Sequence, residues 1–314
     1  MADVKKKATR ESYGEALTAL AEKYPELVVL DADLAAATKT GIFKKAYPDR
    51  FFDCGIAEAN MMGVAAGLAA SGKIPFASTF AMFAAGRAYE IVRNSIGYPG
   101  LNVKIGATHA GISVGEDGAT HQCNEDIALM RTIPGMTVIV PADDTEARAA
   151  VEAAIQHQGP VYMRFGRLAA PILNNPATYK FELGKGITLR DGKDITIVAT
   201  GLMVAEAVAA AETLASEGID ARVINIHTIK PLDDELILKA AKETGRIVTV
   251  EEHSIIGGLG SAVADCVTAG CPVPVMKIGV NDEFGHSGPA VDLLKEFGLS
   301  AENIVATVKR VLGK

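Results

Sequence analysis

FDCGIAEANMMGVAAGLAASG, from Phe52 to Gly72, places one carboxylate, Glu58, directly before a long apolar run. Apolar residues recur in that run at steps of three and four, which is the period of one face of an α-helix. Small residues such as Gly63 and Gly67 allow another backbone to approach closely, although each glycine costs about 1 kcal/mol relative to alanine. We therefore predict a tightly packed helix with Glu58 at its N-terminus, where the carboxylate either complements the helix dipole or serves as a buried acid for proton transfer.

Strand-like and helix-like segments alternate along the whole chain. Helices are predicted over 9–24, 58–70, 124–133, 143–157, 201–217, 232–244, 258–269 and as a closing pair within 289–312, and strands over 27–34, 74–78, 102–108, 136–140, 160–167, 194–200, 220–228, 246–253 and 273–280. Such alternation predicts an α/β fold with two domains, each a mostly parallel sheet with helices on both faces. The stretch PILNNPATYK (171–180) is typical of a linker, so we place the first domain at 1–180, a linker or hairpin at 181–192 and the second domain at 193–314.

The composition excludes several classes of protein. A chain of 314 residues that is 49% hydrophobic is long enough for two domains with full cores. Its net charge of -7 argues against a nucleic-acid or anionic-membrane surface. No apolar run has the length of a membrane span, and the start MADVKKKATRES lacks the apolar core of a signal peptide, so we expect a cytoplasmic protein. The four cysteines show no metal-ligand spacing, and we predict no metal site within this chain.

A long glycine-containing loop, HAGISVGEDGATHQ, follows the strand predicted at 102–108. Loops of this length in a compact domain are usually functional or disordered. This one carries His109, Glu116, Asp117 and His121. Two histidines around an acidic turn suit proton transfer or hydroxyl recognition, although they could also only cap helices. A metal site fits less well, because the spacing of the two histidines matches no helical ligand pair.

Three further features have both a functional and a purely structural interpretation. Asp31 and Asp33 end a predicted strand, where α/β folds bind ligands and where turn aspartates are also common. Phe80 and Phe83 could form a ring-stacking wall or ordinary core. The run IIGGLGSAVAD (255–265) resembles a phosphate cradle before a helix, but it is not a GxGxxG fingerprint, and close helix packing explains its glycines equally well.

Four stretches together carry a resemblance to a known family: GIAEANM (55–61), PFASTFAMF (75–83), ATHAGISVGEDGATHQ (107–122) and FGHSGPAVDLLKEFGLSAENI (284–304). They resemble the pyrimidine-binding and C-terminal domains of transketolase, and the resemblance covers essentially the whole chain. Other thiamin diphosphate enzymes, such as deoxyxylulose-phosphate synthase and the β subunits of 2-oxo-acid dehydrogenases, share parts of these motifs. The GEDGATHQ loop and the FGHSGP ending favour transketolase.

The resemblance implies cofactor-binding and catalytic roles for residues at matching positions. Glu58 matches the glutamate that hydrogen-bonds the aminopyrimidine of thiamin diphosphate and thereby promotes deprotonation of the thiazolium carbon. Phe80 and Phe83 match the aromatic wall against the pyrimidine. His109 and His121 match histidines that contact substrate hydroxyls and assist proton movement.

The same resemblance implies a set of substrate-binding residues. Asp117 matches an aspartate that binds a sugar hydroxyl, and Asp33 is a further candidate from its place at a strand end. Arg10 and Arg167 match the arginines that hold the sugar phosphate, for which a guanidinium fork is well suited.

Two positions depart from the family pattern. Alanines occupy 35–37 where the family supplies a phosphate-contacting serine, which leaves Thr38 or Thr40 to take its place. Ala110 stands where an aspartate often follows the first loop histidine. The core chemistry implied by the resemblance does not depend on either position.

A larger departure is the lack of the GDG motif and downstream asparagine that hold Mg2+ and the diphosphate in the family. We therefore expect a split enzyme in which a separate N-terminal, diphosphate-binding subunit supplies that half of the site. An α2β2 heterotetramer is the expected assembly, with the Glu58 helix in its interface. The implied reaction is ketol transfer between sugar phosphates, as in the pentose phosphate pathway. The alternatives are another thiamin reaction, of the 2-oxo-acid dehydrogenase or deoxyxylulose-phosphate synthase type, and a non-catalytic interaction subunit.

Overall fold

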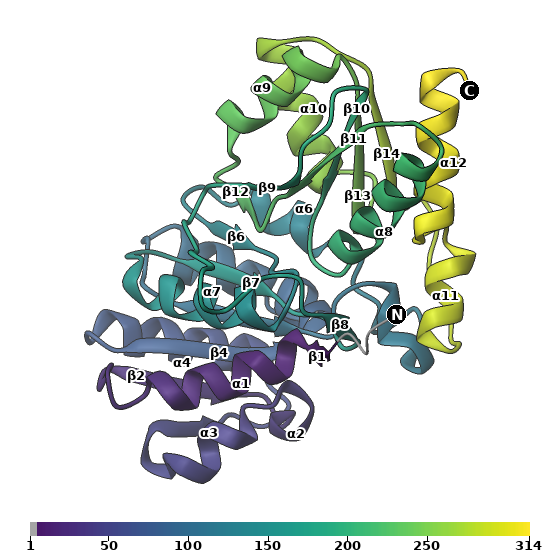
Figure 1. Cartoon of the computed structure of the whole chain (residues 1–314). Coiled ribbons are helices and arrows are strands. Elements are labelled where there is room, and N and C mark those ends of the chain that lie inside the picture. Colours follow the sequence, from purple (N-terminus) through teal and green to yellow (C-terminus); the bar gives the residue numbers. More distant parts are fainter. Residues whose placement is uncertain (1–4) are drawn as a thin grey trace.

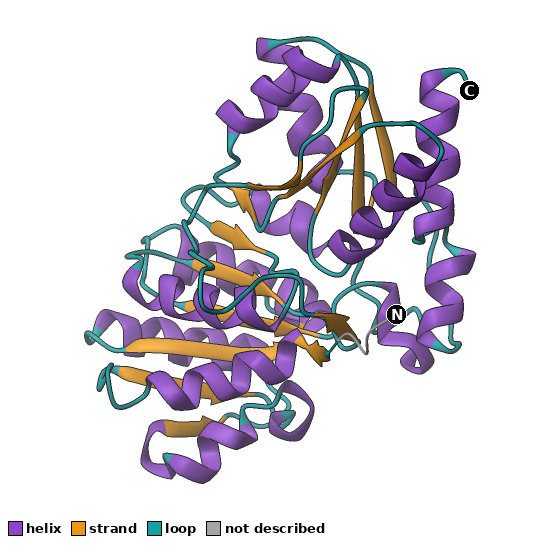
Figure 2. Cartoon of the chain, in the orientation of Figure 1, coloured by secondary structure: helices purple, strands orange, loops and turns teal. Residues whose placement is uncertain are grey.

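Helices and strands alternate through residues 5–314, the part of the chain that the computed structural model describes (Figures 1 and 2). The strands are β1 (Lys6–Ala8), β2 (Leu27–Asp31), β3 (Phe51–Asp53), β4 (Ile74–Phe80), β5 (Lys104–Thr108), β6 (Thr137–Ile139), β7 (Val161–Arg164), β8 (Ala169–Pro171), β9 (Ile187–Arg190), β10 (Ile195–Ala199), β11 (Ala221–Asn225), β12 (Thr228–Lys230), β13 (Ile247–Ser254) and β14 (Val275–Val280). The α-helices are α1 (Thr9–Leu20), α2 (Ala35–Thr38), α3 (Gly41–Ala46), α4 (Glu58–Ala70), α5 (Tyr89–Ile91), α6 (Asp126–Arg131), α7 (Asp144–Gln156), α8 (Met203–Ser216), α9 (Asp234–Thr244), α10 (Leu259–Gly270), α11 (Ala290–Glu296) and α12 (Ala301–Leu312). Short 3-10 helices lie at η1 (Pro48–Arg50) and η4 (Ile112–Asp117), and π-helical turns at η2 (Phe83–Arg87) and η3 (Val92–Gly97).

Two sheets organise these elements, as the alternating pattern predicts. The first has the strand order β12-β6-β7-β5-β4-β2-β3, and the second has the order β14-β13-β10-β11-β9. Within these two sheets all strand pairs are parallel except β12 with β6 and β9 with β11, and β1 and β8 form a separate antiparallel pair. Helices cover both faces of the sheets in Figure 2. The predicted fold class, two α/β units with mostly parallel sheets, is confirmed.

The structure corrects two predicted segments at the edges of the sheets. The segment 181–192, predicted as a linker or hairpin, contains one strand, β9, and no hairpin, and β9 pairs with the otherwise open edge of β11. The single strand predicted over 220–228 is divided into β11, in the second sheet, and β12, which joins β6 in the first sheet. Because β12 crosses from one unit to the other, the two units share backbone hydrogen bonds as well as side-chain contacts.

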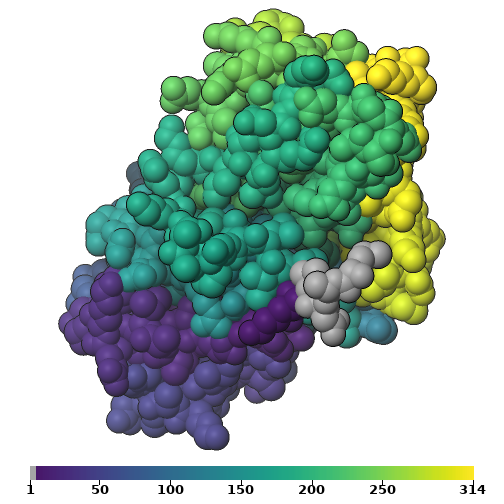
Figure 3. Space-filling view, viewed as in Figure 1, coloured from purple at the N-terminus to yellow at the C-terminus, as the bar shows by residue number. Residues whose placement is uncertain are grey.

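Apolar packing also continues across the junction of the two units. One core cluster contains Ile105 and Val138 from the first sheet together with Val198 and Ile224 from the second. In the space-filling view the first half of the chain, purple to teal, abuts the second half, green to yellow (Figure 3). Among residues 5–314, none of the helices is both long enough and apolar enough to traverse a bilayer.

Candidate functional site

Glu58 is the first residue of α4, as the sequence pattern predicts, and only 7% of it is exposed. It lines an open hollow of about 530 Å³ together with Ile56, Asn60, Phe83 and Arg87. Within residues 5–314, neither a hydrogen bond nor an ion pair engages its carboxylate. A buried carboxylate without a partner, facing a hollow that an aromatic ring also lines, fits a flat heterocycle with a ring nitrogen to protonate or hydrogen-bond.

Four rings form a stacked cluster beside this hollow. Phe80 ends β4 and His109 follows β5, and because these strands are parallel neighbours their carboxyl ends lie together. The ring centroids of Phe80 and His109 are 3.9 Å apart, and those of Phe80 and Phe83 are 5.8 Å apart at an interplanar angle of 12°. His121 meets Phe83 edge-on, with centroids 5.4 Å apart. The two histidines of the loop are thus brought to one aromatic wall.

Hydrogen bonds determine the tautomer of His109. Its Nδ1 lies 2.9 Å from Thr108 Oγ1 and its Nε2 lies 3.3 Å from Arg10 Nη1. A guanidinium only donates, so Nε2 accepts and the ring proton is on Nδ1, which donates to the threonine. Burial, and after it the charges of Arg10 and Arg167, lower the pKa of His109 to about 3. The imidazole is therefore neutral near pH 7, and its Nε2 is a hydrogen-bond acceptor on the Arg10 side.

Three cationic side chains surround this imidazole. Arg10 Nη1 also donates to the carbonyl of Ala37, at 2.8 Å, and burial lowers the pKa of Arg10. Arg167 Nη1 forms an ion pair with Glu116 at 2.6 Å. The charge of Lys39, a residue for which the sequence carries no signal, also lowers the pKa of His109. Positive charge clustered around His109 is suited to an anionic group such as a phosphate.

The threonines expected to replace the missing serine are not available to a substrate, so that expectation is wrong. Thr38 and Thr40 are both fully buried, and each hydroxyl donates to Asp31 Oδ2 at 2.8 Å. The backbone N–H of Leu34 donates to the other oxygen of Asp31 at 2.6 Å. Burial raises the pKa of Asp31, and the three donors offset that effect by stabilising its charged form.

The two aspartates predicted to bind substrate lie in different surroundings. Asp117 is exposed at the end of η4, next to the Glu116 that pairs with Arg167. Asp33 is also exposed, at a φ of 60°, and its backbone N–H donates to Asp53 Oδ1 at 3.2 Å. Asp117 is therefore connected with the cationic side chains only through its sequence neighbour Glu116, whereas the backbone of Asp33 contacts β3.

The glycine turn before α10 is filled by the protein itself, which removes the phosphate-cradle interpretation. Glu251 is fully buried and accepts from the backbone N–H groups of Leu259 and Gly260, at 2.6 and 2.8 Å. A Cβ at position 258 would lie 2.0 Å from Glu251 Oε2, which explains the glycine there. Nearby His253 is also buried, and its Nε2 accepts from the N–H of Ala128 at 3.3 Å. Within residues 5–314, no group of three or more His, Cys, Asp or Glu side chains is arranged to hold a metal ion.

Comparisons with known proteins agree with this geometry. Residues 5–171 match the transketolase pyrimidine-binding domain, and residues 184–304 match the transketolase C-terminal domain. The chain is 52% identical to a putative transketolase C-terminal section of Methanocaldococcus jannaschii, over 98% of this chain and 97% of that protein. It is 48% identical to the 6-deoxy-6-sulfo-D-fructose transketolase subunit SqwH of a Clostridium species, over 96% of this chain and 94% of that protein.

A solved structure described as a split gene transketolase, in an inactive β4 tetramer, superposes with a TM-score of 0.91. It is 56% identical in sequence, and the match covers 98% of both chains. Proteins of this family generally use thiamin diphosphate. Two family domains match this chain, its relatives match over nearly their whole length, and the fold is shared. This chain therefore belongs to the transketolase family, of which it comprises the pyrimidine-binding and C-terminal domains.

Proposed function

We propose that this chain is the β-type subunit of a split, thiamin diphosphate-dependent transketolase, which transfers a two-carbon ketol unit from a ketose phosphate to an aldose phosphate. The observation that carries the proposal is the aromatic wall of Phe80 and Phe83, with His109 stacked on it and the unpaired Glu58 carboxylate in the adjoining hollow. In a transketolase-family chain this arrangement matches the pyrimidine half of the active site. A cytoplasmic location remains part of the proposal.

The residues present fit the pyrimidine part of the cofactor. Glu58 would hydrogen-bond the far ring nitrogen of the aminopyrimidine, and Phe83 would lie against the ring from the other side of the hollow. When bound, thiamin diphosphate supplies the nucleophile and the electron sink of the reaction. Mg2+ and the diphosphate are assigned to the partner subunit, because this chain lacks the GDG motif and the asparagine that hold them in the family.

The substrate side of the proposal rests on charge and protonation. Neutral His109 presents Nε2 as a hydrogen-bond acceptor, so it is suited to contact a sugar hydroxyl, and His121 lies across the same rings. Arg10 and Arg167 would hold the phosphate, and Asp117 a hydroxyl. Because relatives act on other sugars, as the name of the sulfofructose subunit states, the proposal covers anionic sugars of the pentose phosphate type without committing to one donor.

A separate N-terminal subunit completes the proposed enzyme in an α2β2 heterotetramer. The outward face of α4 offers a surface for it, since Gly63 and Gly67 are exposed and a Cβ at either position would meet nothing within 4 Å. Ile56, immediately before the helix, is 83% exposed at the rim of the Glu58 hollow. Relatives described as a section, a subunit and a split gene product support a two-chain enzyme.

Reconstitution tests this function. The chain would be purified alone and together with the diphosphate-binding chain from the same genome, and ketol transfer from xylulose 5-phosphate to ribose 5-phosphate would be assayed with thiamin diphosphate and Mg2+. We expect activity only for the pair. Full activity of the single chain would refute the split enzyme. Pyruvate consumption with glyceraldehyde phosphate, or oxidative decarboxylation with a lipoyl acceptor, would assign the pair to the other thiamin reactions.

A further inference from the structure

The loop that carries His109 is held by a carboxylate from the other half of the chain. Glu252 lies near the end of β13, is 4% exposed, and accepts the backbone N–H of Ser113 through Oε1 at 2.6 Å. A Cβ at position 111 would lie 2.4 Å from the same oxygen, so the Glu252 side chain lies flat against Gly111. One side chain therefore contacts the backbone at two points, two and four residues after His109.

The backbone from His109 to Gly111 has an unfavourable conformation that must be held by contacts such as those of Glu252. His109 has a φ of 54°, in the left-handed region that costs about 1–3 kcal/mol for a residue with a side chain. Gly111 follows with a φ of 80°, where only glycine also leaves room for the Glu252 carboxylate. A strained residue keeps its conformation only if its surroundings fix it, and the hydrogen bond from Ser113 fixes the turn that points the imidazole toward Phe80.

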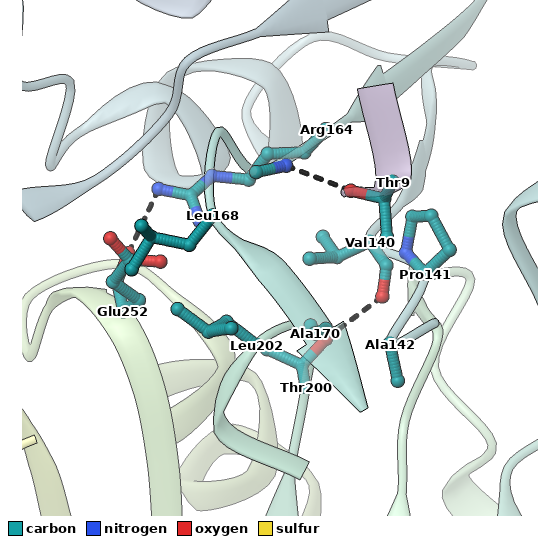
Figure 4. A pocket seen from close by; sticks show the side chains of 12 residues that line it. Thr9, Val140, Pro141, Ala142, Arg164, Leu168, Ala170, Thr200, Leu202 and Glu252 are labelled. Atoms are coloured by element: carbon teal, nitrogen blue, oxygen red, sulfur yellow. Dashed lines mark hydrogen bonds between the residues drawn. The ribbon is translucent and has the colours of Figure 1, made fainter. Parts of the chain in front are cut away.

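Within residues 5–314, the Glu252 carboxylate has no hydrogen-bond or ion-pair partner other than Ser113. In Figure 4, Glu252 and Arg164 lie together on one side of a small cavity of about 20 Å³ at the junction of the two units. Arg164 pairs with the carboxylate of Asp126 at 2.9 Å, and it donates to the backbone carbonyl of Glu252, not to its side chain. Burial raises the pKa of Glu252, and the charge of Arg164 opposes that rise.

The second half of the chain holds the far end of the loop as well. Gln122 Nε2 donates to the carbonyl of His286 at 2.9 Å, and a Cβ at position 118 would lie 2.4 Å from Ser287 Oγ. Helix α11 packs on η4, between these two ends. The segment with Glu116 and Asp117 is thus clamped at both ends by the C-terminal domain, and Glu252 is the contact nearest to His109.

We propose that Glu252 is a positioning residue of the active site, which fixes the turn at Gly111–Ser113 and thereby the orientation of His109 toward the substrate. The expected effect of Glu252 on ketol transfer rests on the proposed function. The contact by which Glu252 holds the loop is a property of this chain alone. It assigns to the C-terminal domain a part in building the pyrimidine-domain site.

The variants Glu252→Ala and Glu252→Gln test this role in the reconstituted complex. Glutamine keeps an oxygen that accepts from Ser113, so Glu252→Gln should stay within about threefold of wild-type kcat. Alanine leaves the turn free, and because small misplacements of reacting groups cost up to about 100-fold, kcat should fall about 10- to 100-fold and the donor KM should rise. The affinity for thiamin diphosphate, which depends on Glu58, should not change.

Glu251 provides a matched control, because it is the neighbouring residue, is also buried and also accepts from backbone N–H groups, in its case those of Leu259 and Gly260 in α10. Glu251→Ala should destabilise the chain without changing the donor KM. Hydrogen exchange of the chain should show faster exchange over 110–116 in Glu252→Ala and wild-type exchange there in Glu251→Ala.

Two results would overturn the proposal: equal kinetic losses in the two alanine variants, or faster loop exchange in Glu252→Ala with kcat and KM within twofold of wild type. A wild-type complex without ketol transfer would refute the proposed function instead, and unchanged exchange over 110–116 in Glu252→Ala would then still refute the holding of the loop.

Discussion

Replacing Thr38 and Thr40 with valine separates a structural role from phosphate binding. Both hydroxyls donate to Oδ2 of the buried Asp31, at 2.8 Å each. A hydrogen bond to a charged group contributes about 1.5–3 kcal/mol, so each single variant should lose that much stability. The two hydroxyls also lie 3.0 Å apart and share one acceptor, so the double variant should lose less than the sum. Valine keeps the shape of threonine, which limits the effect to the hydroxyl.

Urea unfolding of the isolated chain, followed by circular dichroism, measures these losses. Thr213→Val is the control, because its exposed hydroxyl donates only to a carbonyl of its own helix at 3.2 Å, and it should change stability by less than about 0.5 kcal/mol. The KM for sugar phosphates in the reconstituted complex should be unchanged in Thr38→Val and Thr40→Val. A tenfold rise in KM without loss of stability would show that the hydroxyls face the substrate and that this reasoning is wrong.

The pH dependence of the same variants has a defined sign. Burial raises the pKa of Asp31 above its unfolded value, so the folded state binds a proton more readily and this carboxyl contributes less stability as the pH rises through the interval between the two values. Loss of a hydroxyl donor raises the pKa of Asp31 in the folded state further. The stability lost in Thr38→Val should therefore be greater at pH 7 than near pH 4, and an equal loss at both values would contradict this account.

Three further predictions use other parts of the chain. Gly106→Ala should destabilise the chain by about 1–3 kcal/mol, because its Cβ would lie 2.1 Å from the Tyr13 hydroxyl oxygen, and an unchanged melting temperature would contradict this packing. Gly63→Ala should stabilise the isolated chain by about 0.5–1 kcal/mol yet weaken assembly with the partner in sedimentation velocity, whereas unchanged assembly would remove α4 from the interface. Burial lowers the pKa of Lys104 to about 7, so the unfolded state binds more protons above that value and unfolding free energy should rise with pH from about 7 toward the usual lysine pKa. Lys104→Met should remove this rise, and a flat profile in the wild-type chain would show that the lysine is fully charged when folded.

The fold and the centre of the site follow from local patterns in the sequence. Alternating apolar segments indicate parallel strands, and parallel strands place their carboxyl ends at one edge, so Phe80 and His109 meet although they are far apart in the chain. Apolar steps of three and four after Glu58 indicate the helix that begins there. The sequence therefore predicts the residues of the candidate site, and the structure brings Phe80 and His109 together.

Features that depend on side-chain direction or on distant segments could not be found in this way. The threonines after the alanine run have the chemistry of a phosphate ligand, but Asp31 turns inward and takes both hydroxyls. The glycines before α10 make its N-terminus resemble an anion site in the sequence. In the structure the Glu251 carboxylate occupies that N-terminus. Glu252 lies 139 positions after the Ser113 that it holds, and no sequence period links the two.

Glu58→Gln in the reconstituted complex is the most direct measurement of the central claim, that this chain supplies the acid for the pyrimidine side of a thiamin diphosphate site. General acid–base groups contribute about 10²–10⁴-fold to rate, so the variant should retain its fold and its partner while ketol transfer falls by at least about 100-fold. Wild-type ketol transfer in Glu58→Gln would contradict the account.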